Sequence, residues 1–398
     1  MKTAVQFGAG NIGRGFMGQL FWEAGYRTIF IEAQRPMVDL LNEKKKYPLR
    51  LLDAYFKSEI DITIDRFEAL STEDTSKVGE AVAQADVVGT AVGVKNLNAI
   101  APLVAAGIKL RFSKKKGPID IYLCENILDA AETLRKAVMG ILGGKFEDWV
   151  EENVGFVGTS VARMVPAASG RFGVKDPLFV VADSYHKLPY DGRAIRAEQP
   201  AIEGMKPVMN FNAEVERKLF TYNLGHAALA YLGFLKGYTY VHEPFGDNDL
   251  APIVESALDE TTEVLLAMYP EDLDQEEHGE IRNDVRIRFG NPLLMDTVQR
   301  VGRDPVRKLG PNDRLIGSAR LCLSHGVFPR AIAQVCGAAF LYEHPEDPDA
   351  ELLQGKIRNQ GIEKTVKEIT DVEPSSDLGK EIIRSYREFQ KKSKEWKR

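Results

Sequence analysis

The first half of the chain alternates short apolar runs with segments of helical periodicity. Most of the runs are apolar at consecutive positions, so a strand formed there would bury both of its faces. Strands of this kind, separated by helices, are typical of a parallel sheet covered by helices on both sides. A further stretch, residues 47–64, predicts two more strands or a hairpin. The apolar runs occupy residues 3–8, 28–33, 86–92, 119–124 and 178–183.

The second half has a different pattern, and it predicts helices. Strand-like runs are scarce there, and apolar residues recur at helical spacing. Between the halves, residues 185–207 are rich in proline, glycine and charge, which predicts a domain junction. We therefore expect a doubly wound α/β domain in residues 1–192, followed by a mainly α-helical C-terminal domain in residues 193–398. The helical segments are residues 215–235, 252–269, 313–327 and 363–369.

The composition is that of an ordinary globular protein. Of its 398 residues, 44% are hydrophobic and 28% are charged, which is enough for two domains with sizeable cores. The formal net charge of −6 argues against a general binder of nucleic acid or of acidic membranes. No apolar run approaches the roughly 20 residues of a membrane-spanning helix, and the N-terminus lacks a signal-peptide pattern. Three cysteines without CxxC spacing suit a reducing compartment, so we expect a cytoplasmic protein.

A glycine-rich turn follows the first predicted strand and leads into a helical segment. It has the spacing GxGxxG, which in this setting binds a dinucleotide and makes the predicted domain Rossmann-type. Its first glycine permits the tight turn, its second lets the backbone approach the pyrophosphate, and its third lets the helix pack closely. A glycine-rich turn that binds nothing is the competing interpretation. The predicted cofactor-binding residues of the turn are Gly8, Ala9, Gly10, Asn11, Ile12 and Gly13.

An acidic residue ends the second predicted strand. Glu32 would accept hydrogen bonds from a ribose hydroxyl and repel the additional phosphate of NADP, so NAD is the predicted cofactor. The nearby Arg35 weakens this preference. Val92 and Gly93 end a later strand of the same predicted sheet, where ligands of parallel sheets bind, so we expect them beside the cofactor.

The first helical segment of the second half carries Lys218, Asn223 and His226. On an ideal α-helix these residues project within an arc of about 140°, so one wall of a cleft could carry all three. Taken singly, Lys218 could equally be a surface lysine and His226 a hydrogen-bonded core histidine. No HExxH pattern or Cys/His cluster is present, so no metal site is predicted.

The K-x4-N-x2-H pattern of this helix resembles that of the polyol-specific long-chain dehydrogenases, the mannitol dehydrogenase family. Further similar segments occur in the family's order from the glycine-rich turn to residues 313–316, and the resemblance thins toward the C-terminus. They are FGAGNIGRGF, TAVG, CEN, VGFVGTSVARMVP, VERKLF, RFGNPLLMDTVQRVGRDPVRKL and DRLI.

The resemblance implies a Rossmann domain followed by a helical substrate domain, and a metal-independent reaction. It is strongest to the sugar-phosphate enzymes of the family, which implies reversible oxidation of D-mannitol 1-phosphate to D-fructose 6-phosphate with NAD. Carried over to this chain, Lys218 would be the general acid/base. Asn126 and Asn223 would hold the reacting oxygen, and His226 would orient the substrate.

A short basic stretch bears on the substrate. Arginine side chains suit phosphate oxygens, so the stretch could clamp a phosphorylated sugar, and the resemblance favours this role. The same cations could instead pair with Asp304 and Asp313 on the protein itself. The candidate phosphate-binding residues are Arg303, Arg307, Lys308 and Arg314.

Two positions depart from the family pattern. Ala162 stands where the family usually has an aspartate, and Val215 stands where some free-mannitol enzymes have a glutamate. Two alternatives for the function remain open. One is an NAD-dependent mannitol 2-dehydrogenase or a hexuronate (tagaturonate or fructuronate) reductase, and the other is a non-catalytic NAD-binding sensor. The sequence leaves the oligomeric state open.

Overall fold

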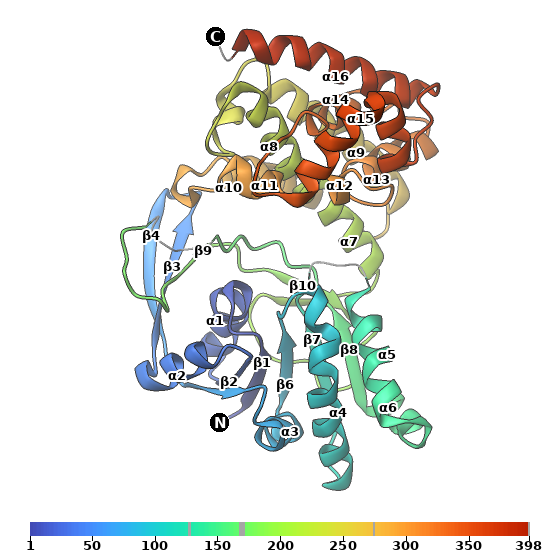
Figure 1. Cartoon of the computed structure of the whole chain (residues 1–398). Helices are drawn as coiled ribbons and strands as arrows, with labels where there is room; N and C mark the ends of the chain where they lie inside the picture. The colour runs from blue at the N-terminus through green and yellow to red at the C-terminus, as the bar shows by residue number, and fades with distance from the viewer. Residues whose placement is uncertain (126–128, 167–171, 274, 397–398) are drawn as a thin grey trace. The chain divides into compact units, whose positions relative to one another are not determined.

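The computed structural model describes residues 1–125, 129–166, 172–273 and 275–396 (Figure 1). Two compact units divide the chain, Met1–Glu214 and Val215–Arg398. The first is built around a parallel sheet, and the second is helical. This confirms the predicted fold class.

The first unit contains a six-stranded parallel sheet with the strand order β5-β2-β1-β6-β7-β8. Strand order reverses between β1 and β6, because β2 and β5 lie on one side of β1 while β6, β7 and β8 lie on the other. Open α/β sheets bind ligands beyond the carboxyl ends of their strands at such a reversal. The strands are β1 (Thr3–Phe7), β2 (Arg27–Glu32), β5 (Phe67–Ser71), β6 (Val87–Thr90), β7 (Ile119–Leu123) and β8 (Val154–Gly158).

Both faces of this sheet are covered. Val5 and Phe7 of β1 belong to one apolar cluster, which includes side chains of α3, α4 and α5. Ala4 of the same strand points the other way, into a cluster with Phe16 and Leu20. Burial on both faces explains why the strands are apolar at consecutive positions. The helices of this unit are η1 (Gly13–Met17), α1 (Gly18–Glu23), α2 (Arg35–Lys44), α3 (Thr75–Gln84), η2 (Val94–Asn96), α4 (Leu97–Ser113), α5 (Ala130–Leu142), η3 (Gly144–Phe146) and α6 (Glu147–Asn153).

A second, three-stranded sheet has the order β4-β3-β9. Strands β3 (Tyr47–Asp53) and β4 (Ser58–Ile64) form an antiparallel hairpin, as residues 47–64 predicted. Strand β9 (Val180–Asp183) pairs with β3 and does not join the main sheet. The expectation that residues 178–183 extend the main sheet is therefore wrong. An apolar run shows that a strand is buried, but its hydrogen-bonding partner is set by the tertiary fold.

The first unit continues past the expected domain border at residues 192/193. Strands β10 (Leu188–Asp191) and β11 (Met205–Val208) pair in parallel, so the proline- and glycine-rich segment belongs to the first unit. Helix α7 (Phe211–Lys218) then contains the division at Glu214.

Helices make up the second unit. In its described residues the bridge between Tyr240 and Thr297 is isolated, and no strand forms. None of the described helices is long and apolar enough to cross a membrane. After α7, the helices are η4 (Leu219–Asn223), α8 (Leu224–Lys236), η5 (Glu243–Gly246), α9 (Ala251–Met268), α10 (Gln275–Phe289), η6 (Pro292–Leu294), α11 (Val298–Gly302), α12 (Pro305–Lys308), α13 (Ile316–Ser324), α14 (Arg330–Ala339), α15 (Pro348–Thr370) and α16 (Asp377–Trp396).

Candidate active site

The glycine-rich turn after β1 is shaped by direct backbone contacts. Gly8 has φ +87°, and a Cβ atom there would lie 2.4 Å from the carbonyl oxygen of Ala91. A Cβ atom on Gly13 would lie 1.9 Å from the carbonyl oxygen of Gly8. Neither position can hold a side chain, because backbone oxygen cannot move aside as a flexible side chain can. The end of β6 therefore touches the turn, at the reversal of strand order.

Space is free around Gly10, whereas neighbouring atoms surround Gly8 and Gly13 closely. Among the described residues, no heavy atom lies within 4 Å of the position that a Cβ atom on Gly10 would take. A helical segment begins next to this open backbone and continues as the π-helix η1, in which Gly18 donates its N–H to the carbonyl of Gly13. An open backbone at a helix N-terminus suits a pyrophosphate, so the turn fits NAD.

The other turn residues pack around this opening. Ala9 is buried, Ile12 is half-buried and Asn11 is exposed. The Asn11 side chain donates a hydrogen bond of 3.3 Å to the carbonyl of Val165, which ties the turn to a distant segment of the same unit.

Glu32 is held at the end of β2 by the turn itself. Its carboxylate accepts hydrogen bonds from the N–H groups of Ala9 (2.9 Å) and Gln34 (3.0 Å). A carboxylate has further lone pairs, so it can still accept from ribose hydroxyls. Arg35, which could have drawn an additional phosphate, pairs instead with Asp39 at 3.1 Å.

The buried side chain of Arg14 supports the turn, a role that was not predicted from the sequence. Its guanidinium is buried and donates hydrogen bonds of 2.6 Å to the carbonyls of Ala9 and Leu178. The hydroxyl of Tyr47 donates to the Arg14 carbonyl at 2.8 Å. The only available signal was an arginine directly after the third glycine.

Val92 and Gly93 follow β6, beside the turn. Both N–H groups donate hydrogen bonds of 2.8 Å to the carboxylate of Glu125, and the Thr90 hydroxyl donates to it at 3.2 Å. Glu125 is 7% exposed, so this carboxylate shapes the loop from inside the protein. The CEN segment includes Glu125, but its sequence did not predict this role. Asn126, the next residue, lies outside the described residues.

The predicted catalytic helix is interrupted by a π turn. Helix η4 joins α7 to α8, and Leu224 donates its N–H to the carbonyl of Leu219, five residues earlier. Residues five apart lie nearly above one another in such a turn. Lys218 and Asn223 are five apart, so they share a face, and the 140° arc expected for an ideal α-helix is wrong. Both side chains are half-buried.

His226 lies one turn beyond Asn223 and is fixed on two sides. Its ring stacks on Phe289 with centroids 4.4 Å apart and an angle of 9° between the planes. Its Nε2 lies 3.0 Å from Oδ2 of Asp296. Burial lowers the pKa of His226 and outweighs the opposing effect of Asp296, so the ring is neutral near pH 7.

In the second unit, Asp296 is a site residue that no sequence pattern predicted. Its carboxylate is 3% exposed and accepts hydrogen bonds of 2.5 and 2.6 Å from Arg300. Burial alone would raise the pKa of Asp296, but the hydrogen bonds from His226 and Arg300 hold it well below the ordinary value. The carboxylate is therefore ionised, and the arginine balances its charge.

Most of the predicted phosphate-binding cations have partners within the protein. Arg307 pairs with Asp313 at 3.0 Å and with Asp304 at 3.5 Å, and Arg314 pairs with Asp313 at 2.8 Å. Arg303 is exposed. In the described part of the chain, its guanidinium makes no hydrogen bond or ion pair.

Lys308 differs from the arginines because it is buried. It is 6% exposed, and its ammonium donates to the carbonyls of Val301 and Arg303. Burial, with Arg314 and Arg307 nearby, lowers the pKa of Lys308 to about 7. A phosphate role for Lys308 would require this side chain to leave its carbonyl partners.

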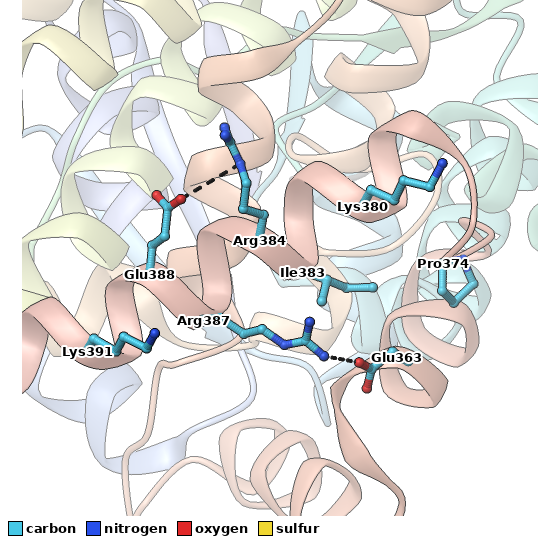
Figure 2. Close-up of a pocket in the computed structure, with 8 residues that line it drawn as sticks. All are labelled: Glu363, Pro374, Lys380, Ile383, Arg384, Arg387, Glu388 and Lys391. Carbon is cyan, nitrogen blue, oxygen red and sulfur yellow. Dashed lines mark hydrogen bonds and ion pairs between the residues drawn. The ribbon is translucent and has the colours of Figure 1, made fainter.

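One surface pocket, of about 370 Å³, lies between α15 and α16 (Figure 2). Its arginines are paired, Arg387 with Glu363 and Arg384 with Glu388. None of the predicted site residues lines it. Across the described residues, no group of three or more histidine, cysteine, aspartate or glutamate side chains could hold a metal ion.

The fold and these residues define the class of two-domain, NAD-dependent dehydrogenases. A family model of the mannitol dehydrogenase Rossmann domain matches residues 2–204, and one of the mannitol dehydrogenase C-terminal domain matches residues 210–390. The chain belongs to the mannitol dehydrogenase family. This confirms the family resemblance and the predicted cofactor, NAD.

Several curated relatives are named mannitol-1-phosphate 5-dehydrogenase. The one from Thermoanaerobacter pseudethanolicus is 36% identical over 98% of this chain and 98% of its own length. The one from Caldanaerobacter subterraneus subsp. tengcongensis is 37% identical over 98% of this chain and its full length. The one from Brevibacillus brevis is 35% identical over 99% of this chain and 98% of its own length.

Solved structures share the fold. A substrate-free D-sorbitol dehydrogenase has a TM-score of 0.81 at 16% identity, covering 98% of this chain and 93% of its own. Pseudomonas fluorescens mannitol 2-dehydrogenase, in a ternary complex with NAD and D-mannitol, has a TM-score of 0.77 at 18% identity, covering 98% and 92%. At these identities the likeness concerns the fold.

Proposed function

We propose that this enzyme interconverts D-mannitol 1-phosphate and D-fructose 6-phosphate with NAD(H). The observation that carries the proposal is the π turn that places Lys218 and Asn223 on one face of the helix that also bears His226. This arrangement would supply a base, an amide donor and an orienting ring for an alcohol. The phosphorylated substrate is proposed from the names of relatives that match over nearly the whole chain.

NAD, when bound, supplies the acceptor for the hydride that leaves the alcohol carbon. The residues that would hold it are those of the turn from Gly8 to Gly13, together with Glu32. The open backbone at Gly10 suits the pyrophosphate, and the Glu32 carboxylate suits the ribose hydroxyls.

We assign the proton transfer to Lys218. Its neutral amine would take the proton of the substrate hydroxyl while the hydride leaves the same carbon, which converts the alcohol to a ketone. In the reverse direction its ammonium would return that proton. Lysine can act in both directions because, unlike arginine, it can lose its proton.

Asn223 and Asn126 would stabilise the reacting oxygen. Each can donate amide N–H groups to the negative charge that develops on this oxygen. Asn223 shares the helix face of Lys218, so the proton acceptor and the amide donor could reach the same oxygen. His226 would contact a different group of the sugar and fix its orientation.

For the phosphate group we propose the basic stretch, with Arg303 as its most available member. Arg307 and Arg314 are held by Asp313, and Lys308 is buried. An exposed guanidinium can bind two phosphate oxygens at once. Arg307, Lys308 and Arg314 would then act mainly by adding positive charge near that group.

Parallel assays of NADH oxidation test the substrate. The expected result is the highest kcat/KM with fructose 6-phosphate. The highest value with fructose would indicate a mannitol 2-dehydrogenase, and the highest value with tagaturonate or fructuronate would indicate a hexuronate reductase. NADH binding without oxidation by any of these sugars would indicate a sensor.

We further propose that the enzyme acts in the cytoplasm. Its three cysteines are free and buried, which suits a reducing compartment. Fractionation of the source cells, with the NADH oxidation assay on each fraction, would test this location.

A further inference from the structure

The two nitrogens of the His226 ring have different surroundings. Nε2 bonds to Asp296, and the flat face of the ring stacks on Phe289. The side chain is 18% exposed, so part of it remains accessible. The nitrogen left for a ligand is Nδ1.

The bond to Asp296 decides which nitrogen carries the proton. Both oxygens of the carboxylate already accept hydrogen bonds from Arg300. An ionised carboxylate can only accept, so the shared proton must sit on Nε2 of His226. In a neutral ring the hydrogen bond at one nitrogen fixes the state of the other, so Nδ1 is a bare acceptor.

Arg300 has a further effect on this pair. A lone buried carboxylate would favour a charged imidazolium, which donates from both nitrogens. Here the guanidinium of Arg300 balances the carboxylate, and Lys308 adds more positive charge near the ring. Burial, together with Arg300 and Lys308, therefore keeps His226 neutral, while Asp296 orients the ring.

We propose that Asp296 is a positioning residue that holds His226 protonated at Nε2, so that Nδ1 accepts a hydrogen bond from a hydroxyl group of the sugar. This inference rests on the proposed function, because it requires His226 to contact the substrate. It also specifies the chemistry recognised there. A hydroxyl can donate to Nδ1, whereas an ionised carboxylate or phosphate oxygen has no proton to give.

Nitrogen NMR of protein labelled with ¹⁵N-histidine measures the tautomer without any substrate. The chain has six histidines, and the spectrum of His226→Asn assigns the signals of His226. The expected result is a protonated Nε2 and an unprotonated Nδ1 at neutral pH. A protonated Nδ1 in the wild-type protein would overturn the proposal.

A pair of variants tests the role of Asp296. Asp296→Asn should mix the tautomers and raise the KM for fructose 6-phosphate roughly tenfold to a hundredfold, with the KM for NADH unchanged. The matched control is Asp371→Asn, because Asp371, like Asp296, pairs with an arginine but is exposed. Equal spectra and KM values for Asp296→Asn and wild type would contradict the proposal.

Sugar analogues test the direction of the hydrogen bond. In fructose 6-phosphate each free hydroxyl can be replaced by hydrogen or by fluorine, and fluorine cannot donate. At the carbon whose hydroxyl contacts His226, hydrogen and fluorine should lower kcat/KM equally in the wild-type enzyme. In His226→Ala, neither replacement should have much effect. A fluoro analogue that performs like the parent sugar there would show that His226 donates. If the enzyme leaves fructose 6-phosphate unreduced, the proposed function fails, and the NMR measurement still determines the tautomer.

Discussion

Lys218 and Asn223 are separated by a π turn, in which the N–H of Leu224 reaches back to the carbonyl of Leu219. The wide turn brings two residues five positions apart onto one face. A second π-helix, Gly13–Met17, begins at the last glycine of the nucleotide-binding turn. Such turns occur often at functional sites, and in this chain they accompany both of its predicted sites.

If Lys218 is the general acid/base, its replacement should lower kcat, and another positively charged residue at this position should not restore kcat. Lys218→Ala should lower kcat about 10²- to 10⁴-fold, the usual contribution of a general acid/base, while the Kd for NADH stays within about twofold. Lys218→Arg should be equally inactive, because arginine keeps its proton. Steady-state kinetics and NADH titration measure both. Lys364→Ala, an exposed lysine of α15, is the control, and near-normal turnover of Lys218→Arg would remove the base role.

Glu32 should control the choice between NAD and NADP. Glu32→Gln keeps an acceptor for Ala9 but removes the charge that repels a 2′-phosphate. We expect the ratio of kcat/KM for NADP to that for NAD to rise about tenfold or more, because a hydrogen bond to a charged group is typically worth about 1.5–3 kcal/mol. The control is Glu68→Gln, at a half-buried carboxylate on β5 that pairs with Arg27. An unchanged ratio would assign cofactor choice to other residues.

Glu125 should support the loop after β6. In Glu125→Gln the amide group would face one of the N–H groups of Val92 and Gly93, and that donor would lose its acceptor. We expect the free energy of unfolding to fall by about 1–3 kcal/mol and the Kd for NADH to rise. Urea unfolding and NADH fluorescence titration measure the two effects. Glu132→Gln, at an exposed pair on α5, should change neither.

Arg303 should matter for a phosphorylated sugar and not for the cofactor. Arg303→Ala is expected to raise the KM for fructose 6-phosphate roughly tenfold or more, since it removes charge-assisted hydrogen bonds. The KM for NADH and the activity with free fructose should stay the same. Arg320→Ala, which removes an arginine paired with Asp371, is the control. If Arg303→Ala has the KM of the wild type, the phosphate binds elsewhere.

Lys308 should make the free energy of unfolding of the protein depend on pH above about pH 7. Its pKa falls from 10.5 to about 7 on folding, so between these values the unfolded chain holds a proton that the folded chain has lost. The free energy of unfolding should therefore rise with pH in this window, by up to about 1.4 kcal/mol per pH unit.

Urea unfolding of wild type and Lys308→Met at several pH values isolates this effect. As the pH rises through this window, the free energy of unfolding of the wild type should rise relative to that of Lys308→Met. Lys364→Met, at an exposed position, should show no such trend. Parallel pH curves for wild type and Lys308→Met would mean that Lys308 keeps its ordinary pKa.

The sequence determined what depends on neighbouring residues. The strand, glycine turn and helix lie within the first 23 residues, and Gly13 is required by its contact with the carbonyl oxygen of Gly8 in the same turn. Glu32 follows at the end of the next strand. Alternating strands and helices, and then helices alone, were enough to predict the two kinds of domain.

The tertiary structure decided what depends on residues far apart in the chain. Asp296 is 70 positions from His226, and Glu125 is 33 from Val92, so no local pattern links either pair. The same holds for β9, which is apolar enough for the main sheet but pairs with β3. Residue type and spacing predict which chemistry a segment can supply. Packing determines the protonation state, the neighbouring charges and the hydrogen-bond partners of each group, because a buried polar group bonds to a complementary group that is close in space.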